Sequence, residues 1–88
     1  MHRATVGFGE GYAGLPEVIR RRADKQFALF KANPHHPCLQ LKKVGEREGH
    51  EVWSARVTLS YRAPAIRRED GYLWFWIGDH TVYEAMIS

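Results

Sequence analysis

The sequence predicts an α+β fold in which an N-terminal helical layer packs on a small, mainly antiparallel twisted sheet. Two observations predict this class. Apolar residues between Leu15 and Ala32 recur at spacings of three and four, as on one face of an amphipathic helix. From Val52 onward, apolar and polar residues alternate between turn residues, as in short strands. A helical face and a sheet face of this kind bury their apolar side chains against each other, in two layers.

Length and composition favour one globular domain that binds anionic partners. The chain has 88 residues, so we expect a single domain over residues 1–88. Hydrophobic residues make up 44% and charged residues 26%, which excludes a disordered chain. The net charge of +3 favours nucleic acid or an acidic protein as the partner. The sequence shows neither a signal peptide nor an apolar run that could span a membrane, so we expect a cytoplasmic location.

The N-terminal third is expected to contain one strong helix. Thr5 to Phe8 can form a short strand, and four glycines between positions 7 and 14 weaken any helix there. The strong helix runs from Leu15 to Ala32, and Asn33-Pro34 ends it because proline disfavours helical geometry at the preceding residue. Its apolar face is predicted to consist of Leu15, Val18, Ile19, Ala23, Phe27 and Phe30. The opposite face carries Arg20, Arg21, Arg22 and Lys25.

Three strands are predicted in the second half of the chain, at Val52 to Leu59, Tyr61 to Ile66 and Tyr72 to Ile77. The first two meet in a tight hairpin centred near Leu59, and Asp70-Gly71 marks the second hairpin. Before these strands, residues 39–44 form an irregular extended segment and residues 45–49 an exposed turn. Residues 80–88 form a short terminal helix or a tail.

Alternation along the last strand separates two sets of large side chains. Leu73, Phe75 and Ile77 are expected in the core against the helix. Trp74 and Trp76 then lie on the open face of the sheet, where exposed aromatic side chains typically mark a docking surface.

Candidate catalytic residues gather on this open face. If the first hairpin centres on Leu59, Arg56 and Arg62 lie opposite each other. A phosphate suits two neighbouring guanidinium groups, and the alternative is that each pairs with a carboxylate from a nearby loop. His80 follows the last strand and is expected near Arg62, and Tyr83 shares its side of one helical turn.

Arginine, histidine and tyrosine side chains around one pocket can cleave RNA without a metal. The 2′-hydroxyl attacks its own phosphate, a base removes its proton, an acid protonates the leaving 5′-oxygen, and cations stabilise the extra charge. Histidine suits proton transfer near neutrality. The segment His35-His36-Pro37-Cys38 has no second set of ligands elsewhere, so we expect no metal site and no cofactor.

The chain from about Leu15 to Tyr83 resembles the RelE/ParE superfamily, the toxins of bacterial type II toxin–antitoxin systems. The residues that carry this resemblance follow the same order along the chain. They are Leu15-Pro16, Phe27, Phe30, Asn33-Pro34, Leu39, Lys42-Lys43, Trp53 to Val57, Tyr61-Arg62, Trp76 to His80, and Tyr83.

The resemblance implies a RelE-like mRNA interferase that cuts mRNA on the ribosome and inhibits translation. It implies that Arg56 and Arg62 hold the phosphate, that His80 is the general acid or base, and that Tyr83 stacks on the nucleotide. Asp79 is an alternative base. Lys42, Lys43 and Ser54 are expected to contact RNA, although Ser54 stands where some members have a lysine and cannot replace it in proton transfer. The implied partners are a cognate antitoxin, mRNA and the ribosome, and the free toxin is expected to be a monomer.

Two other functions fit the same resemblance. ParE-type members poison DNA gyrase with the same fold and without nuclease residues. A catalytically inactive module that only binds an antitoxin is the third interpretation. His80 together with Tyr83 favours the nuclease over the gyrase poison.

Overall fold

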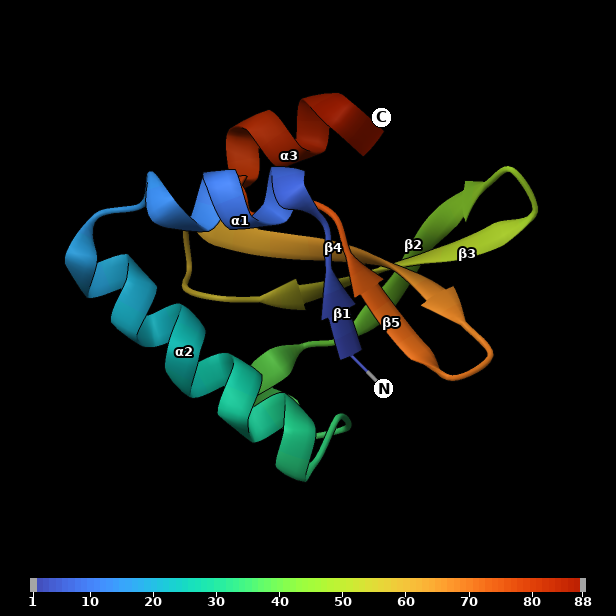
Figure 1. Ribbon diagram of the computed structural model, residues 1–88, viewed down its shortest axis with the longest axis horizontal. Helices are drawn as coiled ribbons and strands as arrows, with labels where there is room; N and C mark the ends of the chain where they lie inside the picture. Colours follow the sequence, from blue (N-terminus) through green and yellow to red (C-terminus); the bar gives the residue numbers. More distant parts are fainter. Residues whose placement is uncertain (1, 88) are drawn as a thin grey trace.

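The computed structural model describes residues 2–87 of the chain and the side chains of residues 3–85. It confirms the predicted α+β class. In Figure 1 the long helix α2 runs along one side of the sheet, whereas the C-terminal helix α3 lies near the start of β4. In chain order the elements are β1 (His2–Ala4), α1 (Val6–Ala13), α2 (Glu17–Ala32), the 3₁₀ helix η1 (Pro37–Leu39), β2 (Lys42–Arg47), β3 (His50–Arg56), β4 (Tyr61–Arg68), β5 (Gly71–Trp74), β6 (Gly78–Asp79) and α3 (His80–Ile87).

The sheet has the strand order β1-β5-β4-β3-β2, and β6 pairs with the first residues of β4. β3 to β5 form the predicted antiparallel meander, β2 extends it beyond β3, and β1 adds one parallel strand to β5. The sheet is therefore mixed, because the chain enters at the edge beside β5 before it forms the helical layer. Among residues 2–87, no helix combines the length and the apolar character that crossing a bilayer requires.

The prediction of a strand at Thr5 to Phe8 is wrong, because helix α1 occupies this region. Thr5 caps the helix through its side-chain oxygen, which accepts a hydrogen bond from the Phe8 amide at 3.1 Å. Gly11 packs closely against Ile77, since a Cβ at Gly11 would lie 3.0 Å from the Ile77 carbonyl oxygen. Glycine, which is unfavourable in an isolated helix, thus permits a close approach that stabilises this one.

Helix α2 confirms the predicted helix and its end at Asn33, with one change in the buried face. Val18 is exposed, whereas Gln26 is buried. The Gln26 amide donates hydrogen bonds to the Arg56 carbonyl at 2.8 Å and to the Cys38 carbonyl at 3.2 Å. A polar residue therefore joins the helix to β3 and η1, and an apolar pattern cannot reveal such a residue.

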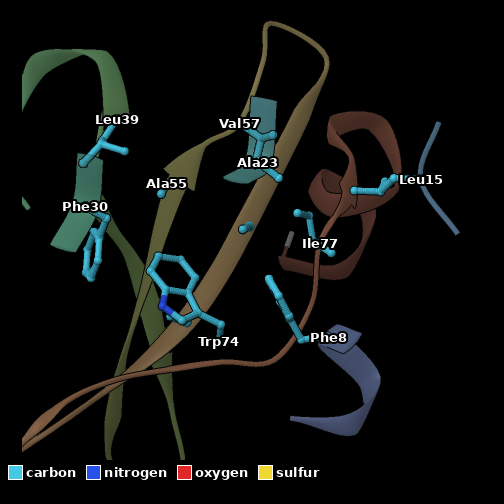
Figure 2. Close-up of a cluster of buried hydrophobic side chains, with 11 residues drawn as sticks. Phe8, Leu15, Ala23, Phe30, Leu39, Ala55, Val57, Trp74 and Ile77 are labelled. Carbon is cyan, nitrogen blue, oxygen red and sulfur yellow. The ribbon is translucent and has the colours of Figure 1, made fainter. Parts of the chain in front are cut away.

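The expectation that Trp74 lies on the open face is wrong. The β4–β5 register pairs Ala65 with Trp74, and directly opposed residues project to the same face. Trp74 is 3% exposed and packs edge-to-face against Phe27 and Phe30, each with a centroid distance of 5.2 Å. Figure 2 shows its indole within the core cluster.

The strand predicted at residues 72–77 ends at Trp74, so alternation does not continue beyond it. Ile77 is buried in the core as predicted, whereas Phe75 and Trp76 are half-buried. The predicted turn at residues 45–49 is also shorter than expected. Strand β2 continues to Arg47, and the turn itself consists of Glu48 and Gly49, both with positive φ angles.

Candidate active site

The hairpin of β3 and β4 places two arginines opposite each other. Arg56 pairs with Arg62 in the register, which confirms the prediction that the hairpin centres near Leu59. Ala55 and Ala63, the next pair along the hairpin, face the core beneath α2. Because side chains alternate along a strand, Arg56 and Arg62 project from the opposite face of the sheet.

Arg62 is held by three groups from different elements. Its Nε donates a hydrogen bond to the Ser54 hydroxyl at 2.8 Å, and one terminal nitrogen donates to the Gln40 carbonyl at 3.4 Å. The guanidinium carbon lies 5.9 Å from the centre of the Tyr83 ring, within the range of a cation–π contact. These contacts fix the guanidinium before any ligand binds.

Ser54 is completely buried, with 0% of its surface exposed. The expected contact between Ser54 and RNA does not fit this burial, since its hydroxyl is covered by the protein and accepts the Arg62 hydrogen bond. Ser54 therefore orients an arginine in this structure. Alternation along β3 puts Ser54 on the same face as Arg56, but the burial of Ser54 on that face was not evident from the sequence.

Tyr83 is also buried, at 3% exposure, and its ring stacks with Trp76 at 6.5 Å and an angle of 26°. The role of a nucleotide platform suggested for Tyr83 does not fit this position, because a platform needs an exposed ring face. Tyr83 instead supports Arg62 from the side of α3. Its hydroxyl is buried and has no hydrogen-bond partner among the described residues.

His80 is brought to the same end of the sheet by β6. Strand β6 pairs Gly78 with Arg62, and the His80 amide donates to the Ser60 carbonyl at 2.7 Å. The imidazole Nδ1 lies 3.3 Å from the same carbonyl oxygen. A proton on Nδ1 can be donated to this oxygen, which leaves Nε2 as the acceptor nitrogen. The sequence interpretation missed Ser60, because only its backbone takes part.

Asp79, the alternative base, is engaged as a cap of α3. Its carboxylate accepts a hydrogen bond from the Thr81 amide at 2.8 Å. This hydrogen bond to Thr81 lowers the pKa of the Asp79 carboxyl. A carboxylate with a lowered pKa is a weaker base, so the geometry favours His80 for proton transfer.

Three of the predicted residues line one hollow of about 240 Å³. They are Arg62, His80 and Tyr83. The RNA-binding candidate Lys42 joins them, because it pairs with Ser54 and therefore shares the face of the site. The remaining lining residues were not anticipated and are Val44, Leu59 and Glu84. Glu84 follows His80 by four residues, so helical spacing could have indicated it.

Three predicted residues are not part of this lining, and one of them is the buried Ser54. Arg56 projects from the same sheet face but is not part of the lining. Lys43 pairs with Trp53 and therefore faces the other way, where its ammonium group lies 3.0 Å from Glu46 and 3.6 Å from Glu51.

The described part of the chain contains no group of three or more histidine, cysteine, aspartate or glutamate residues that could hold a metal ion.

Comparisons with known proteins show the fold. No family model matches the sequence, and no curated protein matches it. The structure resembles a chain of the RelB–RelE antitoxin–toxin complex from Methanococcus jannaschii, with a TM-score of 0.73, 13% identity, and coverage of 98% of this chain and 99% of that one. It also resembles a chain of the archaeal RelE–RelB complex from Pyrococcus horikoshii OT3, with a TM-score of 0.69, 12% identity, and coverage of 89% of this chain and 91% of that one. The chain therefore has a RelE-like fold.

Proposed function

We propose that this chain is the toxin of a toxin–antitoxin module and that it inhibits translation as a metal-independent endoribonuclease. The observation that carries the proposal is the hollow in which an oriented arginine, a histidine and a lysine meet, at Arg62, His80 and Lys42. The RelE-like fold supports it, because both structural neighbours come from complexes of a toxin with its antitoxin. The substrate is mRNA on the ribosome, and the protein partner is a cognate antitoxin.

The hollow suits cleavage by the RNA's own 2′-hydroxyl. The 2′-oxygen forms a bond to the adjacent phosphorus while the bond from phosphorus to the 5′-oxygen breaks, which yields a 2′,3′-cyclic phosphate and a 5′-hydroxyl. Arg62 binds the phosphate oxygens through the terminal nitrogens that Ser54 leaves available, and Lys42 adds a second positive charge. Both cations stabilise the charge that develops on the phosphorane.

Two protons move in this reaction, one from the 2′-hydroxyl and one to the 5′-oxygen. His80 transfers one of these two protons through Nε2. Its other nitrogen, Nδ1, can keep its own proton by donating it in a hydrogen bond to the Ser60 carbonyl. Glu84 is the carboxylate of the same hollow and is our candidate for the other transfer. The pair would then supply both proton transfers without a metal.

The test is cell-free translation with added protein, followed by mapping of cuts on the mRNA. We expect wild-type protein to cut and His80→Ala to lower the cleavage rate about 10²- to 10⁴-fold, the usual contribution of a general acid or base. Arg62→Ala should lower it about 10²- to 10³-fold, as for the loss of a preorganised donor. Arg22→Ala is the matched control, because Arg22 is exposed on α2 and lies on the other side of the sheet.

Cleavage that survives both substitutions at the site would contradict this proposal. Inhibition of DNA gyrase without any mRNA cleavage would instead support the gyrase poison. Absence of both activities, with an antitoxin still bound, would support the inactive binding module.

A further inference from the structure

A shallow groove continues from the hollow along the same face of the sheet. Its lining combines the apolar residues Val44, Val52, Pro64 and Phe75 with Gly45, Glu46 and Arg47. Val44 lines both the hollow and the groove, so the two spaces are neighbours. Pro64 and Val52 are buried by the fold, whereas Phe75 is half-buried. Phe75 is therefore the aromatic residue of this lining, and part of its surface is exposed.

The position of the groove relative to Arg62 is fixed by β4. Pro64 lies two residues beyond Arg62 and projects from the same face, about 7 Å further along the strand. The Phe75 amide donates to the Pro64 carbonyl at 3.3 Å, which holds Phe75 beside this position. This displacement is close to the spacing between successive nucleotides in an extended strand.

The ends of the groove carry the charge that a nucleic acid needs. Arg47 is exposed where the groove meets the end of β2, and Lys42 lies at the hollow. Glu46 also borders the groove, but its carboxylate is paired with the Lys43 ammonium at 3.0 Å. An apolar floor between cationic groups is the arrangement that single-stranded nucleic acids favour.

The groove is open because of a glycine. Gly45 follows the bulge in β2 and pairs with Val52, and a Cβ at Gly45 would meet no atom within 4 Å. Its backbone has no positive φ angle, so a larger residue is sterically allowed there. A side chain at position 45 would project into the space above Val52.

We propose that this groove is a nucleobase subsite, in which the base next to the scissile phosphate stacks on Phe75 while Arg47 contacts the following phosphate. The inference rests on the proposed ribonuclease function and extends it to the neighbouring nucleotide. The subsite takes a single-stranded base, because a paired and stacked base could not lie on the Phe75 ring.

The experiment measures binding separately from cleavage. The probe is a short, fluorescently labelled single strand of 2′-fluoro RNA, which lacks the attacking hydroxyl and cannot be cut, and the readout is fluorescence anisotropy. We expect Phe75→Leu to weaken binding about tenfold, as for the loss of one stacked base, and Phe75→Tyr to bind like wild type. Gly45→Leu should weaken binding to a similar extent by filling the groove. Val18→Ala, at an exposed position on α2, is the control.

A second measurement identifies the stacked nucleotide. When one base at a time is removed from the probe, wild-type protein should lose affinity most at one position, and Phe75→Leu should show no loss at that position. Thermal unfolding of each variant shows whether it is folded, and Gly45→Leu removes no native contact, so it tests the groove even if Phe75→Leu is unstable.

The outcomes separate the two proposals. Phe75→Leu and Gly45→Leu proteins that bind the probe like wild type would overturn the subsite, whether or not the wild-type protein cuts mRNA. Failure of wild-type protein to bind the probe would overturn it too. Binding that depends on Phe75, in a protein that does not cut mRNA, would uphold the subsite and reject the ribonuclease function.

Discussion

The two faces of the central sheet use buried residues for different purposes. The face beneath α2 combines small and large apolar side chains, with Ala63 and Ala65 leaving room for Trp74. The opposite face buries the apolar Val52 and Pro64 and, beside them, the polar Ser54, which is 0% exposed and accepts the Arg62 hydrogen bond. The comparison teaches that one face of this sheet stabilises the fold, whereas the other uses part of its buried volume to orient a charged group.

This difference predicts that substitutions on the two faces change different quantities. Replacements beneath α2 should lower the free energy of unfolding and affect RNA cleavage only through the loss of folded protein. Replacements around Arg62 should lower the cleavage rate in a protein that remains folded. The following predictions test this separation, beginning with the largest expected effect.

Trp74→Ala should lower the free energy of unfolding by about 3 to 5 kcal/mol, because it removes the aromatic side chain at the centre of the core. This is a large part of the roughly 5 to 15 kcal/mol that stabilises a typical domain. Urea denaturation followed by circular dichroism measures it. Trp74→Phe should lower the free energy of unfolding much less, since it keeps a ring against Phe27 and Phe30. It also removes an indole N–H that has no acceptor among the described residues.

Ser54→Ala should lower the turnover number about 10- to 100-fold with little change in KM, because Arg62 loses the acceptor that orients it. Single-turnover cleavage and thermal unfolding, measured on the same preparation, separate this effect from a loss of folded protein. Ser60→Ala is the matched control, since Ser60 contacts His80 through its backbone carbonyl. A loss of stability with an unchanged rate in the remaining folded protein would show that Ser54 is only a packing residue.

The smallest expected effect is a decrease in melting temperature at acid pH, caused by protonation of the Asp79 carboxylate. Its pKa is lowered in the folded protein by the hydrogen bond from Thr81, so the unfolded chain binds the proton more tightly. The stabilisation is therefore present above the ordinary carboxyl pKa of about 4 and is lost as the pH falls through the lowered folded value. Thermal unfolding between pH 2 and pH 6 should show this slope in wild type and a flatter one in Asp79→Asn. Equal slopes would show that this cap contributes nothing.

Features that depend on neighbouring residues in the chain could be predicted from the sequence. Helix α2 and its end at Asn33 follow from apolar spacing and from Pro34. The tight connection at Leu59 fixes the β3–β4 register, so the opposition of Arg56 and Arg62 could also be predicted. A short helix after His80 was one of two alternatives, and α3 confirms it.

Features that depend on how distant segments meet could not be predicted in this way. The β4–β5 register, which places Trp74 beneath α2, is set by pairing with Ala65. The bulge between Lys43 and Gly45 shifts the register of β2, and the pairing leaves only Lys42 of the two lysines at the hollow. Helix α1 forms despite its glycines, and one of them, Gly11, packs against the distant Ile77.

The α+β class, the main helix and the hairpin that opposes the two arginines can all be read from the amino-acid order alone, because they follow from local periodicity and short connections. The sequence also placed His80 near Arg62, but the folded chain was needed to show that Lys42 joins them in one hollow while Arg56 and Lys43 lie outside it. The physical reason is that strand pairing and helix packing fix which distant side chains meet, and neither leaves a periodic signal in the sequence.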